Sequence, residues 1–375
     1  MKIVIWILSV FLVSISIYCT QEKFPLPSIP PEKERFDLGE ARYVQLNPPL
    51  DAAHGYAFNK PSDIYVGADD FVYVADTKNN RIVMMDIGGA IQGYSQTIPH
   101  PEAITQNDSL QLLIVNKSNA VFRIDLYKYN HEIGNAPVEI VYQQLTEPSR
   151  QFTGISVHNK SEYYVTVLDT ADSSSNTLEF SFIYDFYSNH TWKGPLDLNV
   201  NGTGLYSAIV PTGIVSLRER YLDISSQETT PEFIFCQSGK TSLLRNNFKV
   251  QAITIGVSEG AIFLTPKTSF IGTDIYDVSK YFFPEDVAID HSGFIFVVDK
   301  GRDITDPDTT KPAPGFYRFA SSGTQLQAVL GAGSGAGQFN GPKGIAVTPV
   351  GEEQIVYVAD TGNDRVLLFR LSTQF

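Results

Sequence analysis

Six short segments of this 375-residue chain carry polar residues directly ahead of an apolar run, and these residues are its best candidates for chemistry. The six are Ser62-Asp63, Glu102-Ala103, Thr153-Gly154, Thr212-Gly213, Glu285-Asp286 and Lys343-Gly344. Carboxylates such as Glu102 and Glu285 offer the oxygen ligands that a hard cation such as Ca²⁺ takes. Because the segments lie far apart in the sequence, they can act together only if the fold gathers them.

The segments belong to an internal repeat. The last stretch, Gly341 to Ser372, contains three short apolar runs separated by turn-rich residues, the pattern of consecutive antiparallel strands. Pro61 to Asp86 repeats this pattern closely. Weaker copies begin at Pro101, Phe152, Pro211 and Pro284. Most copies leave room for a fourth strand, and four-stranded units repeating every ~40 to 50 residues are typical of propeller blades.

The final copy lacks room for its fourth strand, because the chain ends at Phe375. An additional strand-like run, Ala41 to Leu46, precedes the first copy and has no other partner. A strand from the N-terminus in the last sheet would close the ring and remove its open edges. The sequence therefore predicts an all-β, six-bladed β-propeller over residues 41–375, with an N-terminal strand completing the last blade.

Two phrases of the sequence resemble the NHL-repeat β-propeller family. They are ADTKNNRI at Ala75 to Ile82 and ADTGNDRV at Ala359 to Val366, the second preceded by GSGAGQFNGPKGIAV. The resemblance implies that the first strand of each copy lines a central channel, with the polar residues ahead of it at one mouth. Such propellers include lyases, lactonase relatives, sensors and interaction platforms, so the fold alone does not select a function.

In a ring of six, the second and fifth copies lie opposite each other. Glu102 and Glu285 would then face across the mouth, and with Asp63 and Asp286 they could bind a metal, Ca²⁺ in particular. The alternative is that Glu285 pairs with Lys343 on the next blade while Glu102 points into water.

His100 is the one histidine of six that directly precedes an inner strand. A catalytic zinc ion takes about three protein ligands, so a single histidine at the mouth does not predict a zinc site. His100 is either a loop residue or a ligand at the channel mouth.

A second set of charged residues recurs after the second strand of the repeat. Asp76, Asp299 and Asp360 end that strand, and Arg81 and Arg365 open the third strand in two of the copies. Because the same charges recur at the same turn, we expect them to support the turns and to take no part in chemistry.

The first 19 residues are one lysine followed by an uncharged apolar run, which predicts a secretory signal. Cys19 stands where a lipoprotein would be acylated, although Tyr18 is large for the preceding position, and an ordinary secreted protein is the alternative. The Pro-rich residues 20–40 are expected to form a tether. A lipid anchor on Cys19 would place the protein on a membrane of the bacterial cell envelope. Five Asn-x-Ser/Thr triplets, which would accept glycans in a eukaryotic secreted protein, are the main observation against a bacterial origin.

The formal net charge of -13 argues against a nucleic-acid partner, which requires a basic surface. Because the chain has few groups suited to catalysis, the sequence favours a non-enzymatic platform that binds a protein, peptide or glycan, with no cofactor. The alternative is a metal-assisted hydrolase or lyase at the channel mouth, with Glu102 and Glu285 as ligands and His100 as a proton shuttle.

Overall fold

The computed structural model describes residues 41–170, 181–196, 210–217, 231–238, 247–259, 261–348 and 354–372. The predicted signal segment with Cys19 and the predicted tether lie outside these residues. Within the described part of the chain, no helix is long and apolar enough to cross a membrane.

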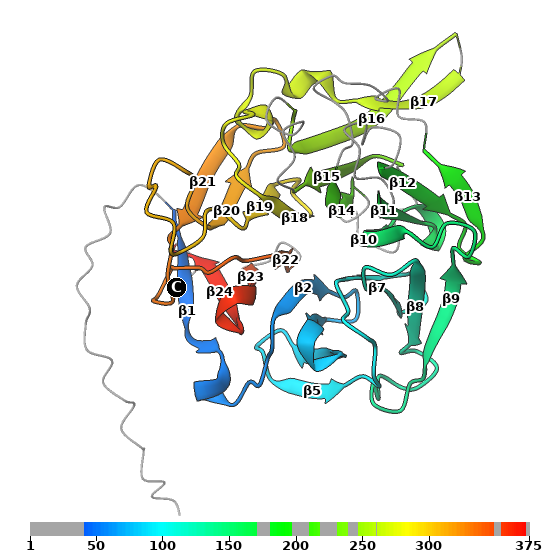
Figure 1. Cartoon of the computed structure of the whole chain (residues 1–375), viewed down its shortest axis with the longest axis horizontal. Coiled ribbons are helices and arrows are strands. Elements are labelled where there is room, and N and C mark those ends of the chain that lie inside the picture. The colour runs from blue at the N-terminus through cyan, green and yellow to red at the C-terminus, as the bar shows by residue number, and fades with distance from the viewer. Residues whose placement is uncertain are drawn as a thin grey trace, which may run out of the picture. The chain divides into compact units, whose positions relative to one another are not determined.

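Six four-stranded antiparallel sheets are arranged around a central channel (Figure 1). The first three sheets, in the order of their strands, are β2 (Pro61–Val66), β3 (Phe71–Asp76), β4 (Arg81–Asp86) and β5 (Ile91–Tyr94); β6 (Ala103–Gln106), β7 (Gln111–Val115), β8 (Ala120–Asp125) and β9 (Val138–Gln143); and β10 (Arg150–Val157), β11 (Tyr163–Asp169), β12 (Ser181–Phe186) and β13 (Trp192–Pro195). We call them blades one to three. The six-bladed propeller predicted from the sequence is confirmed.

Blades four to six follow the same plan, with short 3-10 turns between some strands. Their strands are β14 (Pro211–Ser216), β15 (Phe233–Gln237), β16 (Val250–Ser258) and β17 (Ala261–Pro266); β18 (Pro284–Ile289), β19 (Ile295–Asp299), β20 (Gly315–Phe319) and β21 (Gln325–Leu330); and β22 (Gly344–Val347), β23 (Ile355–Asp360), β24 (Arg365–Leu371) and β1 (Tyr43–Leu50). The 3-10 turns are η1 (Ala52–His54), η2 (Thr77–Asn79), η3 (Asn159–Ser161), η7 (Thr268–Phe270), η8 (Asp274–Tyr276) and η9 (Thr361–Asn363).

The ring is closed by β1, which pairs antiparallel with β24 from Tyr43 opposite Leu371 to Leu50 opposite Val366. One sheet therefore contains residues from both ends of the propeller. Blade six also meets blade one directly, since Thr361 Oγ1 donates a hydrogen bond to the Pro61 carbonyl at 2.7 Å.

Burial of apolar side chains between neighbouring sheets stabilises the ring. The cluster between blades one and two illustrates the packing: Tyr73 and Ile82 from the first blade contact Ile114 and Ile124 from the second, and all four are fully buried. Their alternation along the strands follows from the period of two that a β-strand imposes.

The recurring Asp and Arg residues support turns, as the sequence predicted. In blade one, Asp76 accepts the Asn59 N–H and the Arg81 Nε–H, each at 2.8 Å. In blade six, Asp360 accepts the Asn340 N–H at 2.7 Å and the Arg365 Nε–H at 2.8 Å.

Candidate functional site

One mouth of the channel gathers most of the polar residues that precede the inner strands. The cavity there, which we call the mouth cavity, is lined by Ser62, Asp63, Glu102, Ala103, Lys117, Thr153, Thr212, Gly213, Glu285, Asp286 and Lys343. Every candidate from the sequence is among them except His100. His100 is exposed on the connection that leads to β6, and its N–H donates to Asn80 Oδ1 at 2.9 Å.

The hydroxyl groups of the mouth cavity join neighbouring blades. Ser62 Oγ donates to the Pro101 carbonyl at 3.1 Å, and Thr153 Oγ1 donates to the Pro211 carbonyl at 2.8 Å. Thr212 Oγ1 makes the same contact with the Pro284 carbonyl at 3.4 Å. Since each hydroxyl proton is used in a contact between blades, these three side chains position the inner strands.

Glu102 is held by two lysines. Lys343 Nζ lies 3.0 Å from Glu102 Oε1, and Lys117 Nζ contacts the same oxygen. Burial would raise the pKa of Glu102, but the ammonium groups of Lys343 and Lys117 outweigh this effect and lower it. The alternative considered from the sequence was that Glu102 points into water and that Lys343 forms an ion pair with Glu285. In the structure, Lys343 instead forms its ion pair with Glu102. Glu285 accepts a hydrogen bond from Ser238 Oγ at 2.9 Å.

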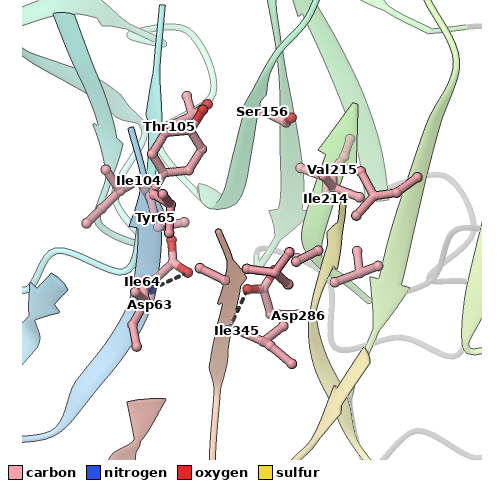
Figure 2. A pocket seen from close by; sticks show the side chains of 18 of the residues that line it. Asp63, Ile64, Tyr65, Ile104, Thr105, Ser156, Ile214, Val215, Asp286 and Ile345 are labelled. Atoms are coloured by element: carbon pink, nitrogen blue, oxygen red, sulfur yellow. Dashed lines mark hydrogen bonds between the residues drawn. The ribbon is translucent and has the colours of Figure 1, made fainter. Parts of the chain in front are cut away.

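Asp63 and Asp286 form a carboxyl pair at the floor of the mouth cavity, which we call the acid pair. Asp63, only 8% exposed, accepts the N–H groups of Ile64 and Ile104, each at 2.7 Å. Asp286 accepts the Ile345 N–H at 3.1 Å, and the two carboxyl groups interact electrostatically. Figure 2 shows the two carboxyl groups on either side of Ile345.

Two glycines leave the space that the acid pair occupies. A Cβ atom on Gly344, in the strand between the two acids, would lie 2.5 Å from Asp63 Cα. A Cβ atom on Gly213 would lie 2.3 Å from Asp286 Oδ1. A side chain at either position would collide with Asp63 or Asp286. The two glycines therefore leave the space in which both carboxyl groups fit.

The protonation of the acid pair is displaced from that of ordinary carboxyl groups. Burial, and then the Asp286 charge, raise the pKa of Asp63 well above its usual value. Burial raises the pKa of Asp286 to about 7, although its backbone hydrogen bonds act in the opposite direction. Two neighbouring buried carboxyl groups cannot both ionise freely, so the pair keeps one proton after Asp286 has ionised near pH 7.

A second cavity lies on the other side of the acid pair, and we call it the inner cavity (Figure 2). Asp63 and Asp286 line both cavities, while the walls of the inner cavity are largely apolar, with Ile155, Val215 and Val287 among them. Two of its hydroxyl-bearing residues again join blades: Thr105 Oγ1 accepts the Val157 N–H, and Ser156 Oγ accepts the Ser216 N–H. The acid pair therefore faces a pocket with many aliphatic side chains, which Asp290 and His291 also line.

Two features of the site were missed from the sequence. Lys117 comes from the turn between β7 and β8, and not from a segment ahead of an inner strand. That turn lies at the same end of the blade as the start of the first strand, so antiparallel order alone could have indicated it. His291, in the turn between β18 and β19, lines the inner cavity, and burial lowers its pKa.

Fold and site together define a six-bladed β-propeller with an acidic centre and a charged mouth. The NHL repeat family model matches residues 58–83, so the resemblance read from the sequence is confirmed for the repeat in blade one. No curated protein matches the sequence significantly.

Solved structures with a similar fold include a gluconolactonase from Xanthomonas campestris, with 11% identity, a TM-score of 0.55 and coverage of 89% of this chain and 90% of that one. A luciferin-regenerating enzyme has 10% identity, a TM-score of 0.54 and coverage of 88% and 95%. A calcium-binding regucalcin from Agrobacterium tumefaciens has 9% identity, a TM-score of 0.52 and coverage of 88% and 94%. At these identities the likeness shows the fold.

The expectation of a non-enzymatic binding platform is wrong, because the propellers of similar structure include enzymes. The expectation rested on the small number of groups in the sequence that are suited to catalysis. It overlooked the acid pair, which no single repeat copy reveals.

Proposed function

We propose that this propeller is a hydrolase that cleaves a small ester inside the channel. The observation that carries the proposal is the acid pair, Asp63 and Asp286, which lies between the mouth cavity and the apolar inner cavity. Carboxyl groups with displaced pKa values in a cleft are candidates for acid–base work. The gluconolactonase among the similar structures makes a lactone the first substrate to test.

The pair can supply both proton transfers of ester hydrolysis. The ionised carboxyl accepts a proton from a water molecule while the water oxygen bonds to the ester carbonyl carbon. The neutral carboxyl donates its proton to the alkoxy oxygen as the bond between that oxygen and the carbonyl carbon breaks. A lactone then opens to a hydroxy acid, the pair still holds one proton, and transfer of that proton between the two carboxyl groups restores the starting state.

Apolar walls favour a substrate with a hydrophobic portion. Burying a methylene group contributes ~0.8 kcal/mol, so each added carbon that fits the inner cavity should improve kcat/KM several-fold. Activity should rise as the pH rises through about 7, because Asp286 then ionises and can act as the base, while Asp63, whose pKa is raised well above its usual value, still carries the proton to be donated.

Calcium is the metal that the oxygen ligands of the mouth would take, and one similar structure is a calcium-binding protein. The residues present do not fit it. Glu102 Oε1 already contacts two ammonium groups, and the described part of the chain has no group of three or more His, Cys, Asp or Glu residues arranged around a metal position. The proposed reaction therefore uses the protein's own carboxyl groups.

The test is hydrolysis of lactones and of p-nitrophenyl esters of increasing chain length by the purified protein. We expect hydrolysis by the wild-type protein and a loss of ~10²–10⁴-fold in kcat for Asp286→Asn. Asp70→Asn, which removes an exposed carboxylate from a turn, is the matched control and should retain full activity. Failure of the wild-type protein to cleave any of these compounds would refute the proposal, as would full activity in Asp286→Asn.

We also propose that the chain is exported and anchored through an acylated Cys19, as its N-terminal sequence suggests. Cells expressing the wild-type chain should incorporate a radioactive fatty acid into it, and cells expressing Cys19→Ala should not. Equal labelling of the two proteins would contradict the anchor.

A further inference from the structure

The channel mouth already contains positive charge where metal ligands were expected. Lys343 directly precedes β22, and its backbone N–H donates to the Ala359 carbonyl at 3.0 Å, which fixes the start of the side chain. Its ammonium group lies 3.0 Å from Glu102 Oε1, and its side chain is 24% exposed. Lys343 is thus held inside the cavity at one of the two predicted metal ligands.

The charges around Lys343 favour its ammonium form. Burial would lower the pKa of Lys343, but the carboxylates of Glu102 and Glu285 outweigh burial and raise it. Glu102 and Glu285, which the sequence predicted as calcium ligands, therefore both stabilise the charged form of Lys343. Lys117, with a side chain that is 44% exposed, adds a second cation to Glu102 from the outer side.

A divalent cation and these ammonium groups compete for the same oxygen atoms. To bind Glu102, Ca²⁺ would have to displace two lysines and would then experience their repulsion at short range. Calcium sites in proteins use six to eight oxygen ligands, and here the one carboxylate held at the centre of the cluster is already neutralised.

We propose that Lys343 is the resident cation of the channel mouth, in the place beside Glu102 and Glu285 that a divalent metal would take, and that it makes the mouth exclude calcium. Lys117 supports it by holding Glu102 from the other side. The inference concerns metal binding and does not depend on the proposed hydrolysis.

The test is calcium titration, followed by isothermal calorimetry and by thermal unfolding, of wild-type protein freed of metal with a chelator. We expect no binding heat and no change in Tm for the wild-type protein. The double variant Lys117→Gln/Lys343→Gln should bind one Ca²⁺, with a rise in Tm of a few degrees at saturation, since a ligand that binds only the folded state stabilises it.

Two further variants serve as controls. Lys343→Arg keeps a cation at the same place and should show no binding heat and no change in Tm with calcium, like the wild-type protein. Lys78→Gln removes an exposed positive charge elsewhere and should also fail to bind calcium. This control separates the local effect of Lys343 from the change in net charge.

Stoichiometric calcium binding by the wild-type protein, abolished by Glu102→Gln, would overturn the proposal. Failure of the folded double variant to gain calcium would overturn it as well, because the lysines would then not be what excludes the metal. If the double variant does not fold, the wild-type and Lys343→Arg titrations still decide. Because none of these readouts is catalytic, their failure is distinguishable from failure of the hydrolase proposal.

Discussion

Buried aspartates occur both in the turns of blades one and six and at the centre of the ring. Their neighbours differ in charge: arginines in the turns and a second carboxyl group at the centre. In the turns, Asp76 and Asp360 are fully buried, and each accepts a charged hydrogen bond from an arginine. In the acid pair, the nearest ionisable neighbour of Asp63 is the carboxyl group of Asp286. The same residue type thus serves as scaffold in one region and as a candidate catalyst in the other.

The comparison teaches that a displaced pKa does not by itself identify a site. Burial raises the pKa of Asp360 too, despite Arg365, and the pKa of Asp299 behaves in the same way. The neighbour and the cavity distinguish the regions. The acid pair lines two cavities, whereas the carboxylate of Asp360 accepts hydrogen bonds from the Asn340 N–H and from the side chains of Asn363 and Arg365.

The largest expected effect is on catalysis at the acid pair. Asp63→Asn should reduce kcat for ester hydrolysis by ~10²–10⁴-fold, as Asp286→Asn does, because a carboxamide can neither accept nor release the shared proton. Steady-state kinetics at pH 6 measure the change. If the double variant Asp63→Asn/Asp286→Asn is no slower than either single variant, the two carboxyl groups act as a unit. Full activity in Asp63→Asn would mean that the acid pair, like the aspartates of the turns, has no catalytic role.

The next effect is on stability at the turns. Asp360→Asn should lower the free energy of unfolding by about 3–5 kcal/mol, because it leaves the buried Arg365 without its carboxylate. Urea unfolding monitored by tryptophan fluorescence measures this loss. The folded fraction should keep its kcat for ester hydrolysis. A variant that is stable but inactive would mean that Asp360 takes part in catalysis.

Arg365 and Arg81 should differ, although they occupy the same position in two blades. The Arg365 side chain is 7% exposed and donates to the Ser334 and Gln338 carbonyls, whereas that of Arg81 is 24% exposed and reaches the Ala57 carbonyl. We expect Arg365→Ala to cost about 3 kcal/mol or more and Arg81→Ala about 1–2 kcal/mol in unfolding free energy. Equal losses would mean that the two turns are equivalent despite their different burial.

The smallest effect concerns pH. Since the folded-state pKa of Asp286 is raised to about 7, the folded protein binds more protons than the unfolded chain between about pH 4 and 7, and its stability declines as the pH rises through that window. Asp286→Asn should flatten the decline and should be more stable than the wild-type protein at pH 8 by on the order of 1 kcal/mol. Parallel pH–stability curves for the two proteins would contradict the raised pKa.

The sequence could predict the ring and the residues of the mouth because both follow from the repeat. The repeat marks where the first strand of each copy begins, and the family resemblance implied that this strand lines the channel, so Ser62, Glu102 and Lys343 could be placed at one mouth. The closing strand could be inferred as well, since the last copy lacked a fourth strand and one unpaired run remained near the N-terminus.

The meeting of Asp63 and Asp286 could not be predicted in this way. Symmetry places opposite blades face to face and therefore directed attention to Glu102 and Glu285. The acid pair instead spans two blades separated by one, across Gly344, and exists because Gly344 and Gly213 leave space at the channel axis. Contacts of this kind depend on side-chain size at the narrowest point of the ring, which a repeat pattern does not encode.

The most direct test of the account is a ¹³C NMR titration of the aspartate carboxyl groups, with the signals of Asp63 and Asp286 assigned from the two Asn variants. We predict that the first proton leaves the pair near pH 7, the value to which burial raises the pKa of Asp286, and that the pair then keeps its second proton because the pKa of Asp63 is also raised. Titration of both carboxyl groups near pH ~4, as for ordinary aspartates, would contradict it.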